Sequence, residues 1–185
     1  MKNNFNIIIS ILLILFAALS RLVPHPMNFA PITAMALFSG VYLDRKFAFI
    51  IPIAALLISD AFIGFYDGLW WVYGAFALIG LTGIQLRKHL ESKSAGAKAL
   101  YVYLTTLGSS VIFFIVTNFG VWLSGYLYEM NLNGLIKCYV MAIPFFRNTV
   151  AGDLFYVTVM FGVYELILRY AVKHRVSPLG EEIKS

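Results

Sequence analysis

The chain has 185 residues, of which 61% are hydrophobic and only 12% are charged. No core of this size could hide so much apolar surface, so the composition excludes an ordinary soluble domain and predicts an integral membrane protein. The net charge of +5 comes from short basic clusters between apolar runs, without a basic stripe interleaved with aromatic residues, which argues against nucleic-acid binding.

Six apolar segments follow one another along the chain, and we predict an all-α, polytopic bundle of six membrane-spanning helices. They cover residues 5–23, 29–43, 47–66, 69–86, 99–123 and 149–172 of one integral membrane domain, 1–185, which ends in a polar tail at 173–185. The second segment is short, so it must be thinly inserted, begin within the outer boundary of the membrane, or be shielded by its neighbours. The first resembles a signal peptide, but no small-x-small cleavage site follows it, which favours a retained helix.

The basic residues orient these helices. With the N-terminus in the cytoplasm, 11 of the 14 Lys and Arg residues fall on the cytoplasmic side, and only Arg21, Lys137 and Arg147 fall on the other side. This positive-inside asymmetry predicts that both termini are cytoplasmic and that the chain is a multi-pass protein of the cell inner (cytoplasmic) membrane. The three tryptophans, at positions 70, 71 and 122, then fall near the outer interface, which tryptophan prefers.

The first outward segment carries three polar candidates. Charged groups at membrane depth usually face a cavity or find partners, but Arg21, at the end of the first span, would also suit a snorkelling role. His25 is held between two prolines in a stiff, extended segment, although a lone histidine is more often a satisfied polar residue than a ligand. Asn28 is placed to cap the second helix.

The third and fifth spans supply the next candidates. Asp60 lies in the outer third of its span, where it either forms an ion pair with Arg21 or Arg147 or belongs to a binding site. Asn118, near the outer end of the fifth span, is either an interhelical contact or a site residue. Trp122 lies one turn further on.

The stretch "AIPFFRNTVAGDLFY" adds two charges beside the last span. Pro144 breaks or starts a helix, so Asn148 or Thr149 would cap the last span, whose dipole beside Arg147 would attract an anion. Asp153 lies one turn deeper. We expect these charges to line the outer mouth of a pocket, and the alternative is a structural lock between the fifth and sixth spans.

Motifs for several chemistries are absent. The chain has no Walker motif, so it cannot hydrolyse ATP by that mechanism, and it has no Gly-x-Ser-x-Gly nucleophile motif. The single cysteine, Cys138, is either a small apolar residue or a soft ligand. Cys138 or His25 would serve as a metal ligand only if the bound molecule were itself metal-centred. We predict no cofactor.

The runs "RLVPHPMNFAPITAMALFSG" and "IPFFRNTVAGDLFY" resemble an uncharacterised family of small bacterial six-helix membrane proteins. Through size and topology, that family resembles the substrate-binding (S) component of energy-coupling factor (ECF) vitamin transporters. The resemblance implies an S-component-like bundle that binds one vitamin at its outer face and uses a separate transmembrane and ATPase module. It also implies that small-xxx-small patches on early helices dock this module, and the spacings Ala30-x-x-x-Ala34 and Ala36-x-x-x-Gly40 fit.

The sequence therefore predicts the membrane-embedded binding subunit of an uptake transporter, in contact with a small-molecule ligand, membrane lipid and an ECF-type module. We do not expect it to be an enzyme. Two alternatives stay open, an intramembrane enzyme that uses outer-face carboxylates and a structural or assembly subunit. The candidate ligand-binding residues are Arg21, His25, Asn28, Asp60, Asn118, Trp122, Arg147, Asn148 and Asp153.

Overall fold

A computed structural model describes residues 4–176, which form six α-helices and no strand. The helices are α1 (Asn4–Ser20), α2 (Ile32–Tyr42), α3 (Phe47–Ile63), α4 (Leu69–Leu90), α5 (Ala95–Leu123) and α6 (Leu132–Val176). The predicted all-α class and the number of helices are confirmed for the described part of the chain. Residues 177–185, most of the predicted polar tail, lie outside it, and α6 takes in the tail's first residues.

The six helices differ in how well they could cross a membrane. Helices α4, α5 and α6 are the three that are long and apolar enough to span one, while α1, α2 and α3 are apolar but have 17 residues or fewer. At 1.5 Å per residue, 17 residues reach about 25 Å, against about 30 Å of hydrocarbon. By length alone, the structure supports three of the six predicted spans.

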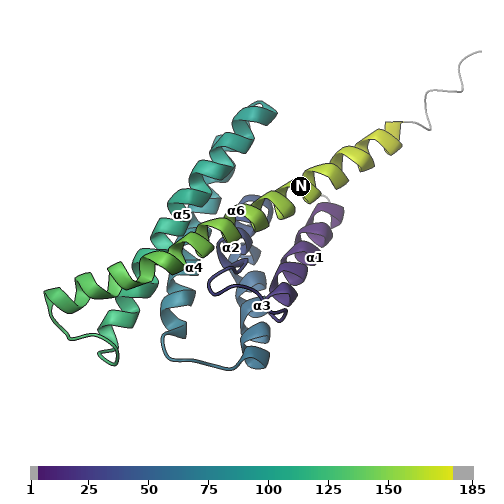
Figure 1. Cartoon of the computed structure of the whole chain (residues 1–185). Coiled ribbons are helices and arrows are strands. Elements are labelled where there is room, and N and C mark those ends of the chain that lie inside the picture. The colour runs from purple at the N-terminus through teal and green to yellow at the C-terminus, as the bar shows by residue number, and fades with distance from the viewer. Residues whose placement is uncertain (1–3, 177–185) are drawn as a thin grey trace, which may run out of the picture.

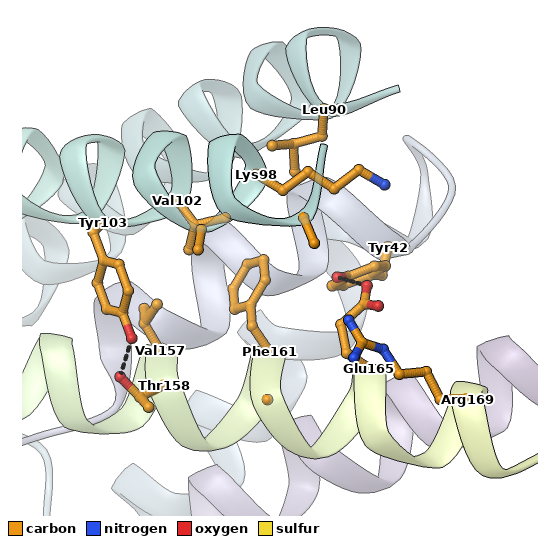
Figure 2. Close-up of a pocket in the computed structure, with 13 residues that line it drawn as sticks. Tyr42, Leu90, Lys98, Val102, Tyr103, Val157, Thr158, Phe161, Glu165 and Arg169 are labelled. Atoms are coloured by element: carbon orange, nitrogen blue, oxygen red, sulfur yellow. Dashed lines mark hydrogen bonds between the residues drawn. The ribbon is translucent and has the colours of Figure 1, made fainter. Parts of the chain in front are cut away.

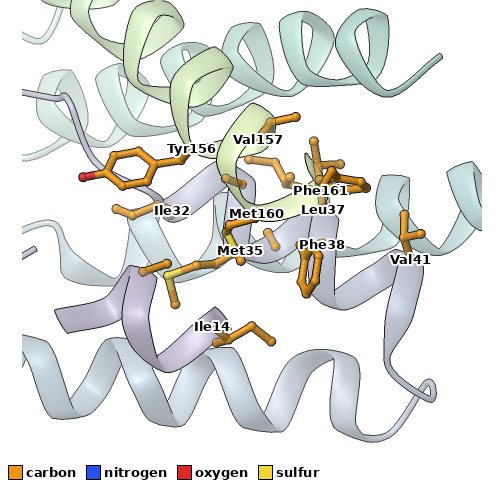
Figure 3. Close-up of a cluster of buried hydrophobic side chains, with 14 of the residues drawn as sticks. Ile14, Ile32, Met35, Leu37, Phe38, Val41, Tyr156, Val157, Met160 and Phe161 are labelled. Carbon is orange, nitrogen blue, oxygen red and sulfur yellow. The ribbon is translucent and has the colours of Figure 1, made fainter. Parts of the chain in front are cut away.

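Helix α2 is the centre of the bundle. Ten of its 11 residues are buried, and it contacts all five other helices. Phe38 and Met35 are fully buried, and their cluster includes Ile14 of α1 and Met160 of α6 (Figure 3). A helix that is apolar on every side is stable only when neighbours cover it. The expected shielding of this short segment is therefore confirmed.

Glycines allow α2 and α4 to pack backbone against backbone. A Cβ added to Gly40 would lie 2.8 Å from the Cα atom of Gly83, and one added to Gly83 would lie 2.8 Å from the carbonyl oxygen of Leu37. Ala34 and Ala36 are fully buried as well. Ala34, Ala36 and Gly40 of the small-xxx-small spacings therefore pack within the chain, whereas Ala30 is only half-buried.

Arg87, in the last turn of α4, fastens the end of α2. Its Nη2 donates to the carbonyl oxygens of Gly40 and Leu43. These carbonyls belong to the C-terminal end of α2, where the helix has no backbone donors left and where its dipole favours a cation. One side chain thus joins the C-terminal ends of α2 and α4.

Helix α6 runs without interruption through Pro144 for 45 residues, and it crosses α5 obliquely (Figure 1). The predicted start of the last span near residue 149 is therefore wrong. Proline removes only one intrahelical hydrogen bond, and packing against α5 holds the segment before it. The ring of Phe114 packs edge-on against Tyr139 and at a tilt against Phe146, and the Tyr139 hydroxyl donates to the carbonyl of Ile115 at 2.8 Å.

Candidate functional site

A buried ion pair joins the end of α1 to α3. Arg21 Nη2 lies 2.6 Å from Asp60 Oδ1, and the two side chains are only 7% and 1% exposed. The Tyr73 hydroxyl donates to Asp60 Oδ2 at 2.7 Å, and Arg21 Nη1 donates to Ser59 Oγ. Both oxygens of Asp60 are thus engaged, which is the arrangement that a buried carboxylate requires. Of the two partners predicted for Asp60, the structure selects Arg21.

In front of this pair lies a cavity of about 440 Å³, within the usual size range of small-molecule sites. Residues from the α1–α2 connection and the first turn of α2, from the α3–α4 connection, from the C-terminal half of α5 and from the middle of α6 meet there. Its polar lining consists of Arg21, His25, Asn28, Thr33, Tyr66, Asp67, Thr117, Asn118, Thr149 and Asp153. We call this cavity the outer pocket, after the side on which the sequence predicts it to lie. Four segments that are far apart in the sequence therefore share one polar space.

Asp153 is the buried acid of the outer pocket. It is 2% exposed, and Ser110 of α5 donates to its Oδ2 at 2.6 Å. The Thr33 hydroxyl, from the first turn of α2, also hydrogen-bonds to it. Among the described residues, its side-chain partners are therefore hydroxyl groups, with no cation. The two buried acids differ in this respect, because Asp60 has a guanidinium partner and Asp153 has none.

The structure divides the predicted site residues into two groups. Five of them line the outer pocket: Arg21, His25, Asn28, Asn118 and Asp153. Four others do not line it: Asp60, Trp122, Arg147 and Asn148. Asp60 is nevertheless linked to the pocket because it holds the guanidinium of a lining residue.

The remaining three residues have other surroundings. Trp122 donates its indole N–H to the carbonyl of Glu129 at 3.0 Å and so ties down the α5–α6 connection. Asn148 donates to the carbonyl of Met27 at 3.0 Å and holds the α1–α2 connection against α6. Arg147 is exposed on the same helix. The hydrogen bonds of Trp122 and Asn148 therefore hold the α5–α6 and α1–α2 connections without lining the pocket.

Two details of the predicted mouth are wrong. Because α6 is continuous, no helix begins at Asn148 or Thr149, so the expected dipole that would attract an anion beside Arg147 is missing. Arg147 does not pair with Asp153, whose Oδ2 instead accepts from Ser110, so that Asp153 joins α6 to α5, as in the alternative of a lock between the fifth and sixth spans. Asn28 does not cap α2, which begins after Pro31 without a side-chain cap; instead Asn28 adopts a positive φ of 63°.

The two residues considered as metal ligands do not come together. His25 is exposed at the outer pocket, and its Nδ1 lies 2.9 Å from the carbonyl oxygen of Pro26. Cys138 is buried between α5 and α6, with its Sγ 3.4 Å from the carbonyl of Asn118. No group of three or more His, Cys, Asp and Glu side chains within residues 4–171 is arranged to hold a metal ion.

Sequence reasoning missed several polar residues of this region. Ser110 and Thr33 lie inside apolar runs, where a hydroxyl ordinarily bonds to its own helix, and their meeting with Asp153 depends on three helices. Tyr66 and Asp67 lie in the short α3–α4 connection. The sequence signal that could have found them is the predicted topology, because it places this connection on the same side as Arg21 and His25.

Comparison with protein families gives one match, which covers residues 1–176. The chain belongs to the DUF6580 family. The family is described as one of unknown function, so membership assigns no ligand to the pocket. Searches of the curated proteins and of the solved structures found no significant match. The membership agrees with the expectation of an uncharacterised family, but no match supports the further resemblance to S-components.

Proposed function

We propose that this member of the DUF6580 family is a six-helix protein of the cell inner membrane that binds a small, vitamin-like nutrient in its outer pocket. In this proposal both termini are cytoplasmic, and the protein is the binding subunit of an uptake transporter. The observation that carries the proposal is the 440 Å³ outer pocket, in which a buried acid without a cationic partner meets polar residues from four segments.

The two ends of the bundle support this orientation. The outer pocket lies where the α1–α2 and α3–α4 connections meet. At the other end, the ends of α2 and α4 and the start of α5 line a second cavity, and this end carries the basic residues of the α2–α3 and α4–α5 connections. A pocket on the side poor in Lys and Arg faces outward under the positive-inside rule.

The charges of the pocket favour a ligand with a positively charged or N–H-donating group. The charge of Arg21 is offset by Asp60, whereas Asp153 and Asp67 line the pocket without a salt bridge to any cation among the described residues. The excess charge is therefore negative. A carboxylate at this depth is stabilised by a cation or by strong donors. This preference replaces the anion-binding corner expected from the sequence.

Uptake would require energy from outside this chain. The sequence has no Walker motif, so it has no ATPase activity of the known P-loop kind. A separate transmembrane and ATPase module remains part of the proposal. Because the small-residue faces of α2 are buried within the bundle, such a module would have to contact other surfaces.

The test is the identification of small molecules that leave the membrane with the protein. The full chain is purified in mild detergent, and the molecules released on denaturation are analysed by mass spectrometry for wild type, Asp153→Asn and the control Glu91→Gln, which changes an exposed acid at the opposite end. We expect one small molecule near 1:1 in wild type and control, and at least tenfold less in Asp153→Asn, a loss of about 1.4 kcal/mol or more.

The same experiment separates the alternatives. A structural subunit would release no enriched molecule, and Asp153→Asn would change only its unfolding temperature; that result would refute the proposal. An enzyme would keep the molecule in Asp153→Asn and convert it more slowly. A bound molecule that is anionic would preserve the binding role but contradict the inferred ligand charge.

A further inference from the structure

A second cavity, of about 390 Å³, lies at the end of the bundle opposite the outer pocket. Figure 2 shows it between the N-terminal part of α5 and the C-terminal part of α6, two helices that diverge after their crossing in Figure 1. Tyr42 at the end of α2 and Leu90 at the end of α4 complete the lining. We call this cavity the inner cleft.

The inner cleft is apolar at depth and charged at its mouth. Its deep end is closed where the hydroxyls of Tyr103 and Thr158 meet at 2.9 Å. The walls next to this bridge are apolar: Val102, Val157 and Phe161. At the other end, Lys98, Glu165 and Arg169 are exposed and extend beside the opening (Figure 2).

The length of the cleft matches one leaflet of a bilayer. Thr158 and Arg169 are separated by 11 positions of α6, which corresponds to about 16 Å at 1.5 Å per residue. Half of the about 30 Å hydrocarbon core is about 15 Å. Measured along α6, the apolar part of the cleft is thus about as long as the half of the hydrocarbon core that one acyl chain occupies.

The mouth has an excess of one positive charge, from Lys98 and Arg169 against Glu165. The carboxylate of Glu165 also accepts a hydrogen bond from the Tyr42 hydroxyl at 3.3 Å. Two cations at the mouth of an apolar slot can bind a phosphate group while the slot holds a hydrocarbon chain. Basic pockets between membrane helices on the cytoplasmic side bind anionic lipid headgroups.

We propose that the inner cleft binds one anionic phospholipid of the cytoplasmic leaflet. Its phosphate lies between Lys98 and Arg169, and one acyl chain lies along Val102, Val157 and Phe161 and ends at the Tyr103–Thr158 bridge. The lipid fills the space that opens where α5 and α6 diverge. This inference rests on the membrane orientation of the proposed function, but it requires nothing of the outer pocket.

The test measures lipid binding to the full chain by native mass spectrometry in detergent. Phosphatidylglycerol and phosphatidylcholine with identical acyl chains are titrated into wild type and into two double variants. Lys98→Gln with Arg169→Gln removes the cations of the cleft. Lys46→Gln with Lys88→Gln removes two exposed cations at the same end that do not line it, so both variants lose the same total charge.

We expect wild type to bind one phosphatidylglycerol in preference to phosphatidylcholine. The cleft variant should bind it about 25-fold more weakly, roughly fivefold for each cation lost near the membrane surface, and the matched control should stay within about twofold of wild type. A third variant, Gly162→Leu, adds bulk to the cleft where a Cβ would meet no atom within 4 Å. It keeps every charge, and it should weaken binding of both lipids.

Three results would overturn the proposal. Equal binding of phosphatidylglycerol to the cleft variant and the matched control would assign the effect to general surface charge. Equal binding of the two lipids to wild type would remove the role of the cations. A cross-link in membranes from Gly162→Cys to a second polypeptide would show a protein helix in the cleft. None of these readouts uses the outer ligand, so failure here leaves the proposed nutrient binding untouched.

Discussion

Removal of Arg21 is expected to destabilise the protein more than removal of its partner Asp60. In Arg21→Met, Asp60 keeps only the Tyr73 hydroxyl, and its side chain is 1% exposed. In Asp60→Leu, the guanidinium keeps Ser59 and the carbonyl of Leu56 as acceptors, and it also lines the outer pocket. A buried charge that loses its partner costs about 3–5 kcal/mol. We expect Arg21→Met to lower the free energy of unfolding by about 3–5 kcal/mol. Asp60→Leu should lower it by about 3 kcal/mol or less.

The double variant Arg21→Met with Asp60→Leu is the decisive comparison. It leaves no stranded charge, and replacement of a buried pair by apolar residues is often close to neutral. It should therefore regain most of the stability that Arg21→Met loses.

Thermal unfolding in detergent, followed by far-ultraviolet circular dichroism, measures these effects. For a chain of this length, 1 kcal/mol corresponds to about 2–4 °C, so Arg21→Met should lower the midpoint by roughly 6–20 °C. The control is Arg45→Met, an exposed position, which should change stability by less than about 0.5 kcal/mol. If the losses of the two single variants simply added in the double variant, the ion pair could not be the reason for either.

Three further predictions concern packing and topology. Gly40→Val should destabilise the protein by about 1–3 kcal/mol or more, because the Cβ of the valine would lie 2.7 Å from the carbonyl oxygen of Gly80. Denaturant unfolding measures this loss, and a variant as stable as wild type would contradict the close packing of α2 on α4. Arg87→Met should cost about 1.5–3 kcal/mol, since two carbonyls at the end of α2 lose a charged donor; Lys88→Met, next to it but exposed, should stay near wild type in the same assay. A reporter inserted within residues 126–131 should be active outside the cytoplasm, and one fused after residue 185 should be active inside; the opposite pattern at both sites would invert the assignment of the two cavities.

Composition and hydropathy were enough to determine the class of this protein and its six helices. An apolar run of 15 residues or more between polar connections can bury its backbone hydrogen bonds only as a helix in an apolar environment. The same local reasoning placed Arg21, His25, Asn118 and Asp153 on one side of the bundle, because the connections alternate between the two ends. Five of the nine predicted site residues therefore line one pocket in the structure.

Only the tertiary structure decided which polar groups meet and where a helix ends. Arg21 pairs with Asp60 across 39 positions, and Ser110 meets Asp153 across 43; no local pattern contains such a distance. Pro144 was a sound signal for a helix break, but its position on α6 costs one hydrogen bond, and the contacts of Tyr139 and Phe146 with α5 outweigh it. Likewise, the small residues of α2 are compatible with an exposed docking face or a buried one. The choice between them depends on whether α4 carries glycines at the matching height, which Gly80 and Gly83 provide.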